Sequence, residues 1–215
     1  MALVKHGQSF KTMAITINGN GTLTGVSVGG LPDGIVDTDM LAANAVTQAK
    51  AAGSVKGITD IDAWAVSANY DASSGSNIIS SNWYQFSTAS GVNFPKLGSS
   101  MSHSSGVFTF PSTGLWTVDF ILGGYNNSNN SGSYFGVLLR YSTDSGSSYD
   151  TRYSAYSNNS GNSDHTQVTV RGYLDVEDTS TARVKFHTNI AAEKNIFGNG
   201  SELRTGAIFT RIGDT

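Results

Sequence analysis

Residues 106–122 read GVFTFPSTGLWTVDFIL, and this stretch decides the fold. Phe108 and Phe110 alternate with other residues before a turn, and Trp116 begins a second alternating run after it. A period of two places one side of a segment in a core and the other side outside, so the pattern predicts two β-strands. The residues at 111–114, Pro-Ser-Thr-Gly, predict the tight turn between them, because Pro presets one backbone angle and Gly tolerates a positive one.

The chain from Ile58 onward shows the same pattern throughout. Short runs are separated by clusters of Ser, Asn and Gly at a spacing of roughly 8–12 residues, which is typical of β-sandwiches. The predicted strands are 61–69, 83–87, 92–97, 107–111, 114–124, 133–142, 149–156, 165–175, 181–189 and 203–211. Long loops are predicted at 71–82, 98–105, 125–132, 143–148, 157–164 and 190–202.

The motif F-T-F-P-x-x-G-L-W-x-V at its centre resembles that of the C1q/TNF-like jelly-roll domain. The order of segments extends this resemblance over about two thirds of the chain. Residues 64–68 are similar to the family's opening strand, residues 168–178 and 181–187 to two later strands, and residues 205–209 to the strand near its C-terminus. The resemblance implies an all-β C1q/TNF-like jelly-roll sandwich that forms a homotrimer. No collagen-like Gly-X-Y stem is present, which favours a microbial or viral relative over an animal one.

Composition limits the possible functions. Charged residues make up 13% of the 215 residues, against the usual ~25%, so neutral polar groups must form the surface, as in extracellular and virion β-proteins. The net charge of −3 and the scattered Lys and Arg argue against nucleic-acid binding. There is no Cys, and no run approaches the ~18 apolar residues of a membrane span.

The N-terminal residues predict an attachment segment. Ile15 and Ile17 precede Asn-Gly-Asn-Gly at 18–21, and Leu23 follows, which predicts a β-hairpin. A lone hairpin is marginal in water, so we expect it to pair with another chain or to dock on a partner; a flexible tail is the alternative. No apolar segment of a secretory signal is found, so we expect synthesis in a host cytoplasm and release by lysis.

Residues 33–56 contain two related decapeptides and resemble the repeats near the start of phage tail-fibre proteins. The segment could also form one short helix, with Asp37 or Thr38 as N-cap and Gly53 beyond its end, or an ordinary linker helix lying on the domain. Its many Ala residues would let copies approach closely around an axis. We therefore predict a virion anchor and short stalk at 1–57 and a jelly-roll head at 58–215.

Strand parity predicts where the loops lie. If each strand crosses the whole sandwich and the last one runs back towards the stalk, five of the long loops fall at the end far from the stalk and only 143–148 falls near it. The far loops combine aromatic faces with amide and hydroxyl groups, which suit sugar hydroxyls, although Asn, Ser and Gly also simply form loops. The candidate receptor-binding residues are Tyr125, Asn126, Asn127, Tyr156, Asn158, Asn159 and Phe197.

Catalytic and metal-binding patterns are weak. The close carboxylates Asp60 and Asp62, and the cluster from Asp175 to Asp178, indicate turns rather than acid–base pairs. The four His residues are widely spaced, and no zinc, EF-hand or phosphate-loop motif occurs, although Asp71, Asp144, Asp150 and Asp164 leave a calcium site open. We expect no enzyme activity, no cofactor and no metal.

Together these features predict a non-enzymatic phage virion structural protein. The favoured form is a homotrimeric tail fibre that is joined to other virion proteins through residues 1–57 and presents distal loops to a host cell-surface glycan or protein. One alternative is a capsid decoration protein or head fibre, and a further one is a secreted bacterial C1q-like lectin. A polysaccharide depolymerase would need a carboxylate pair, and the sequence does not offer one.

Overall fold

The chain divides into two units, Met1–Lys50 and Ala51–Thr215, and each is described by itself. The computed structural model describes residues 57–86, 94, 96–126, 133–158 and 164–215, together with the backbone of 16–17 and 23–24. In the first unit, β1 (Thr16–Ile17) pairs antiparallel with β2 (Leu23–Thr24), which confirms the predicted hairpin. The predicted stalk at 33–56 lies outside the described residues, and its form stays a prediction.

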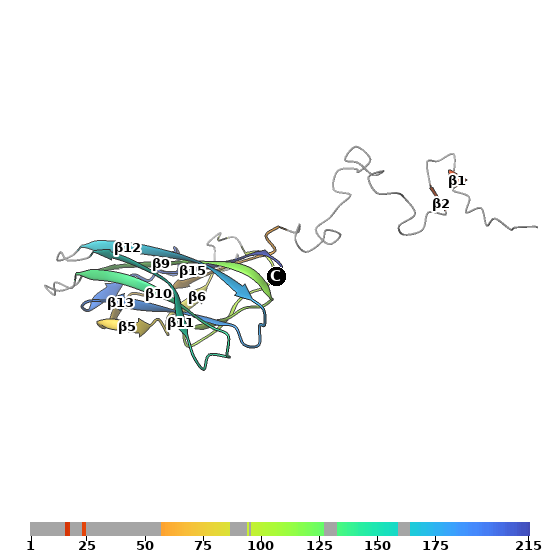
Figure 1. Ribbon diagram of the computed structural model, residues 1–215. Helices are drawn as coiled ribbons and strands as arrows, with labels where there is room; N and C mark the ends of the chain where they lie inside the picture. Colours follow the sequence, from red (N-terminus) through yellow and green to blue (C-terminus); the bar gives the residue numbers. More distant parts are fainter. Residues whose placement is uncertain are drawn as a thin grey trace, which may run out of the picture. The chain divides into compact units, whose positions relative to one another are not determined.

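The second unit is a sandwich of two antiparallel sheets that face each other across one core (Figure 1). The β9 sheet has the order β12-β9-β15-β3-β6, with β14 and β4 continuing from the end of β9. Its strands are β3 (Asp60–Val66), β4 (Tyr70–Ala72), β6 (Trp83–Gln85), β9 (Gly114–Tyr125), β12 (His165–Val176), β14 (Lys194–Ile196) and β15 (Gly206–Gly213).

The β10 sheet has the order β11-β10-β13-β8-β7, and β5 also pairs with β13. Its strands are β5 (Gly75–Ile78), β7 (Ser102–Ser104), β8 (Val107–Thr109), β10 (Tyr134–Ser142), β11 (Asp150–Asn158) and β13 (Arg183–Ile190). The described residues contain no helix, and hence none long and apolar enough to cross a membrane. The all-β prediction for the head is confirmed.

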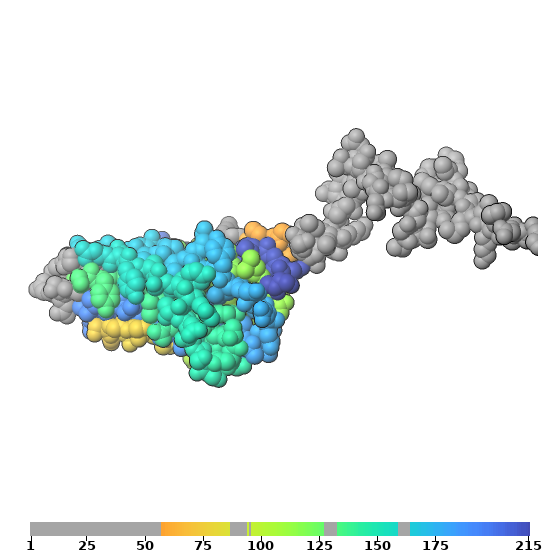
Figure 2. Space-filling model, viewed as in Figure 1, coloured from red at the N-terminus to blue at the C-terminus, as the bar shows by residue number. Residues whose placement is uncertain are grey.

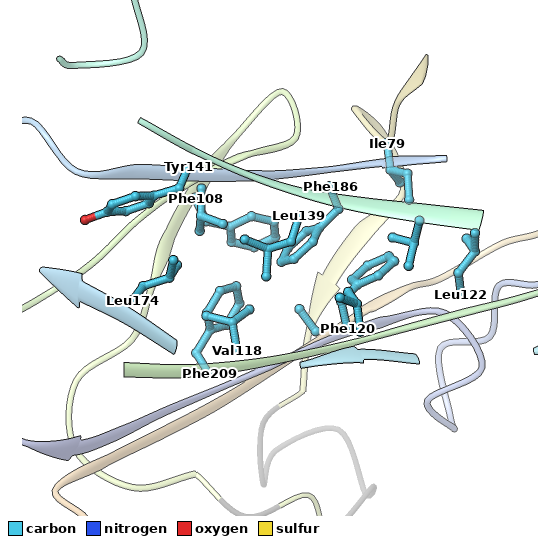
Figure 3. Packing of buried hydrophobic residues seen from close by; sticks show 14 of the residues in the cluster. Ile79, Phe108, Val118, Phe120, Leu122, Leu139, Tyr141, Leu174, Phe186 and Phe209 are labelled. Atoms are coloured by element: carbon cyan, nitrogen blue, oxygen red, sulfur yellow. The ribbon is translucent and has the colours of Figure 1, made fainter. Parts of the chain in front are cut away.

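The core follows the alternation of the 106–122 stretch. Trp116, Val118 and Phe120 are fully buried on one side of β9, and Phe120 stacks on Phe186 of the facing sheet with ring centroids 4.3 Å apart. Figure 3 shows these rings meeting between the sheets. Trp64, Trp83 and Phe108 also pack into this cluster. The large aromatic residues therefore fill the core of a single chain, where each contributes about 1.5–3 kcal/mol or more.

The turn between β8 and β9 forms as predicted. Gly114 has φ 131°, a region that disfavours side chains, and a Cβ there would overlap the carbonyl oxygen of Gly213. The indole Nε1 of Trp116 donates to the carbonyl of Ser112 at 3.2 Å, which ties the turn to the core. This turn begins β9, the strand to which β12, β15 and β14 all pair.

Four short strands lie inside predicted loops. They are β4 and β5 in 71–82, β7 in 98–105 and β14 in 190–202. Their sequences, YDA, GSNI, SHS and KNI, lack an alternating apolar pattern, so pairing with longer neighbours defines them as strands and local sequence does not. The predicted strand 92–97 lies partly outside the described residues; within it, Leu97 forms an isolated bridge to Ile61.

The sandwich has two ends, which we name by the strands that start and stop there. The near end holds Asp60, where β3 begins, its partner Arg211, and Gly114. The far end holds Tyr125, where β9 stops, and its partners His165 and Asn195. Loop 143–148 lies at the near end, as predicted, since Ser142 before it pairs with Arg183 at the start of β13.

The placement of loop 98–105 at the far end was wrong. The backbone N–H of Ser99 donates to Oδ1 of Asp60 at 2.7 Å, so this loop begins at the near end. It then forms β7 and turns back at Gly106, which lies against Ile79. Parity failed because β7 and β8 are short and do not cross the sandwich. The residues that flank 125–132 and 157–164, and strands β4 and β14 within the other two loops, do lie at the far end.

Candidate functional site

Two of the predicted receptor-binding residues come together at the far end. The rings of Tyr125 and Phe197 are nearly parallel, at 21°, with centroids 5.5 Å apart. His165 joins them, 5.7 Å from Tyr125 and 5.1 Å from Phe197. We call these three residues the Tyr125 cluster. The sequence prediction missed His165, because the sequence around a His in a strand does not show which residues lie beside it across the sheet.

Three elements position this cluster. Tyr125 ends β9 on the side opposite the core, since a Cβ on the preceding Gly124 would instead contact the core ring of Phe135. His165 begins β12 directly across from Tyr125 in the antiparallel register. Phe197 follows β14, and its backbone N–H donates to the carbonyl of Gly123 at 2.9 Å. The rings therefore lie on the outward face of the β9 sheet.

A hollow of about 290 Å³ lies beside the cluster. Gly123 lines it and lets the backbone of Arg204 approach, because a Cβ there would lie 2.8 Å from the carbonyl oxygen of Arg204. The Arg204 guanidinium lies 6.0 Å from the centroid of the Phe197 ring and pairs with Glu202. The hollow thus offers an aromatic edge, hydroxyl and amide groups, and one paired cation. Its lining residues are Gly123, His165, Thr166, Gln167, Phe197 and Arg204.

Tyr156 lies apart from this cluster, on the outward face of the β10 sheet. Its neighbours in β11, Tyr153 and Ala155, pack against the core, so alternation turns Tyr156 away from it. Its ring meets Tyr134 edge to face at 6.0 Å, and its hydroxyl accepts a hydrogen bond from Nδ2 of Asn189 at 2.8 Å. The core separates Tyr156 from Tyr125. The predicted residues therefore form two surfaces, not one.

The predicted Asn residues differ in what they can present. Asn126 is buried, so its side chain has almost no solvent-exposed surface. Its backbone N–H donates to the carbonyl of Asp164 at 3.3 Å. Asn158 is exposed at the end of β11, and its carbonyl accepts from Oγ1 of Thr166 at 3.5 Å. Asn127 and Asn159 lie outside the described residues. A role in binding stays a prediction for all four of these residues.

The carboxylates that the sequence brings close together hold the fold. Asp62 is fully buried and accepts hydrogen bonds from the indole of Trp64 at 2.8 Å, the amide of Gln85 at 2.7 Å and the backbone N–H of Met101 at 2.8 Å. Asp62 therefore lies within a strand, as the predicted strand 61–69 has it, and the interpretation of Asp60 and Asp62 as turn residues was wrong. Asp178 does cap a turn, by accepting the N–H of Ser180 at 2.8 Å.

Metal chemistry has no cluster to support it in the described ranges, which contain no group of three or more His, Asp or Glu side chains that could hold an ion. The carboxylate of Asp144 accepts hydrogen bonds from the hydroxyls of Ser142 and Ser148, and these hydrogen bonds lower its pKa well below the usual range. The absence of an enzyme activity stays a prediction.

The order of strands defines the class of the second unit. Two antiparallel sheets, with β12-β9-β15-β3 facing β11-β10-β13-β8, form a jelly roll of the TNF-like kind, as the sequence predicted. The unit is similar to Eiger TNF from S. frugiperda, with a TM-score of 0.54 and 10% sequence identity over 74% of this chain and 95% of that one. It is also similar to murine APRIL, with a TM-score of 0.50 and 8% identity over 72% and 100%.

These likenesses concern the fold alone, because the identities are so low. No protein-family model matches the sequence. No curated protein matches it either. What the jelly roll does in this protein must be argued from its own residues.

Proposed function

We propose that the protein is a non-enzymatic, homotrimeric phage tail fibre, made in the host cytoplasm and carried in the virion, whose head recognises a host cell-surface glycan or protein. Residues 1–57 attach it to other virion proteins. The resemblance of 33–56 to tail-fibre repeats, the low charge and the TNF-like fold support this proposal. The observation that carries it is the Tyr125 cluster beside its hollow at the far end of the head.

A trimer would cover the outward face of the β9 sheet. Ile121 on this face is only partly buried and Tyr173 of β12 is exposed, whereas Ile208 and Ala63 already pack in a small cluster with Phe86 of the same chain. Removing apolar surface from water stabilises an assembly by about 25 cal/mol per Å². An aliphatic face on a sheet whose other side already packs on the core favours contact with further copies of the chain.

Recognition at the far end would use aromatic faces and neutral polar groups. A few hydrogen bonds and ring contacts at one site must offset the loss of motion of ligand and side chains, so each site should bind weakly. Three sites on a trimer, and several trimers on a particle, would raise the avidity by about 10²–10⁴ where they can engage together. Weak sites on a multivalent fibre are sufficient for cell attachment.

The double variant Tyr125→Ala/Phe197→Ala tests this role in the full chain. Both side chains are only partly buried, so we expect the trimer to persist and the melting temperature to change little, while binding of the labelled protein to host cells falls at least tenfold. Leu97→Ala, which shortens an exposed apolar side chain at the near end, is the matched control.

Two results would overturn the receptor role. One is a double variant that binds cells as the parent does. The other is a parent protein that binds no cells at all, in which case a capsid decoration protein or head fibre becomes the better reading. Electron microscopy of virions labelled on this protein would separate tail from capsid, and a protein missing from particles would favour the bacterial lectin.

A further inference from the structure

A second group of exposed side chains lies on the outward face of the β10 sheet, at its far end. Tyr134, Tyr156 and Ile78 are 39%, 51% and 36% exposed. With Asn189 and His187 we call them the lateral patch. Tyr156 and Asn189 flank Gly136 in one row of the sheet, and Ile78 lies opposite His187 in the next. Figure 2 shows β10 and β11, in green and teal, and β5, in yellow, exposed on the same side of the head.

The ring of Tyr156 is held in place before any ligand arrives. It lies over Gly136, where a Cβ would overlap the ring, so the missing side chain forms its seat. Asn189 fixes the other end, because its Nδ2 donates to the Tyr156 hydroxyl at 2.8 Å. A fixed ring loses little conformational entropy when a ligand packs on its open face. The platform is therefore built for a flat apolar partner with polar edges.

His187 adds a polar atom that lacks a partner. The side chain is 8% exposed, its Nδ1 lies 3.2 Å from Oγ of Ser76, and its Nε2 is buried without a hydrogen bond. Burial, helped by the positive charges of Arg140 and Lys185, lowers the His187 pKa to about 4. The imidazole is therefore neutral at pH 7, and the lateral patch carries no charge of its own.

We propose that the lateral patch binds a neutral hexopyranose, with the C–H face of the sugar on Tyr156 and its hydroxyls towards Asn189 and towards Ser76, which Nδ1 of His187 contacts from below. Stacking rings with convergent amide and hydroxyl groups suit a polyol that has one apolar face. Three exposed large side chains are also far fewer than the ~20–30 residues a side of a stable protein interface.

This proposal adds a saccharide site to the recognition role argued above, and it lies on the opposite sheet from the Tyr125 cluster. The test is saturation-transfer NMR on the full chain with methyl α-D-glucopyranoside, methyl α-D-mannopyranoside and methyl β-D-galactopyranoside as probes. We expect at least one probe to bind with a dissociation constant on the order of 1–10 mM, as a single stacked ring allows. Tyr156→Ala should weaken that binding at least tenfold.

Three further variants make the result specific. Gly136→Ala leaves the Tyr156 side chain in the protein but pushes its ring out of position, so this variant should weaken binding several-fold. Leu97→Ala shortens an exposed apolar side chain (45%) at the near end and should leave binding unchanged. The Tyr125→Ala/Phe197→Ala variant should also bind the probe as the parent does, so loss of cell binding and loss of sugar binding are separable. No saturation transfer from any probe, or equal binding by parent and Tyr156→Ala, would overturn the proposal.

Discussion

The two sheets share one core but present different outward faces. The β9 sheet offers the aliphatic side chain of Ile121, the exposed ring of Tyr173 and a surface ion pair between Arg171 and Asp119. The β10 sheet carries Tyr rings such as that of Tyr156, together with amide and imidazole groups. Strand residues alternate inward and outward in both sheets. The inward residues specify the fold, so the outward residues are free to differ between the two faces. The first face suits association of copies, and the second suits contact with small polar ligands.

The largest expected effect follows from placing a charge on each face. Ile121→Arg puts a cation on the β9 face, and a desolvated, unpaired charge opposes any assembly that buries it. Ile78→Arg makes the same change on the β10 face. We expect light scattering to give a monomer for Ile121→Arg and a trimer for Ile78→Arg. The reverse outcome, or a monomeric parent, would mean that the β9 face is not the trimer interface.

A smaller expected effect concerns the pH dependence of the free energy of unfolding, to which His187 on the β10 face contributes. The folded-state pKa of His187 is about 4, against about 6.5 when unfolded, so between these values the unfolded chain binds a proton that the folded chain does not. The free energy of unfolding should therefore fall as the pH drops from about 6.5 to 4, by about 1–3 kcal/mol from this group. Above pH 6.5 the contribution of His187 does not change.

Urea unfolding at several pH values measures this dependence. His187→Gln should make it shallower between pH 6.5 and 4, and the part that remains includes His103, whose pKa burial also lowers. Carboxylates such as Asp144 and Asp178, whose pKa values are lowered by hydrogen bonds from Ser side chains, lose their contribution at lower pH in all variants alike. Parallel curves for the parent and His187→Gln would show that this His does not titrate as inferred.

The long strands could be predicted from the sequence because each carries its own alternation. The Trp116 run became β9, and its turn formed at Gly114 as expected. The predicted strand 61–69 includes Asp62, but its burial could not be predicted, because its partners Gln85 and Met101 lie 23 and 39 residues away. Short strands such as β14 have the same limit, since they exist only through pairing with distant segments.

The candidate site was predictable only in part, for a similar reason. Alternation says which way a strand residue points but not which loop residue lies beside it. Strand parity correctly predicted that Tyr125 and Phe197 lie at the same end of the sandwich, and their rings stack there. It could not reveal that Tyr156 faces the other side, because a terminal position on a strand fixes the end of the sandwich and not the sheet. The burial of Asn126 could not be predicted either, because it depends on segments far away in sequence.

The smallest expected effect compares the cations on the two faces. On the β10 face, Nζ of Lys185 lies 3.7 Å from the centroid of the Tyr149 ring, and burial lowers the Lys185 pKa with help from Arg140. On the β9 face, Arg171 and Asp119 form an ion pair with 63% and 21% of their side chains exposed. Lys185→Met should cost about 0.5–1 kcal/mol of unfolding free energy, the worth of a cation–π contact at an exposed site.

Arg171→Met should cost less than Lys185→Met, because water and salt compete for both partners of the exposed ion pair. A double-mutant cycle assigns the Lys185 effect to its cause: in a Tyr149→Leu background, Lys185→Met should cost nothing further, since the ring that attracts the ammonium is gone. An equal cost in both backgrounds would exclude the ring as the source. Raising the salt concentration should reduce the effect of Arg171→Met more than that of Lys185→Met, since the cation–π contact depends less on long-range charge.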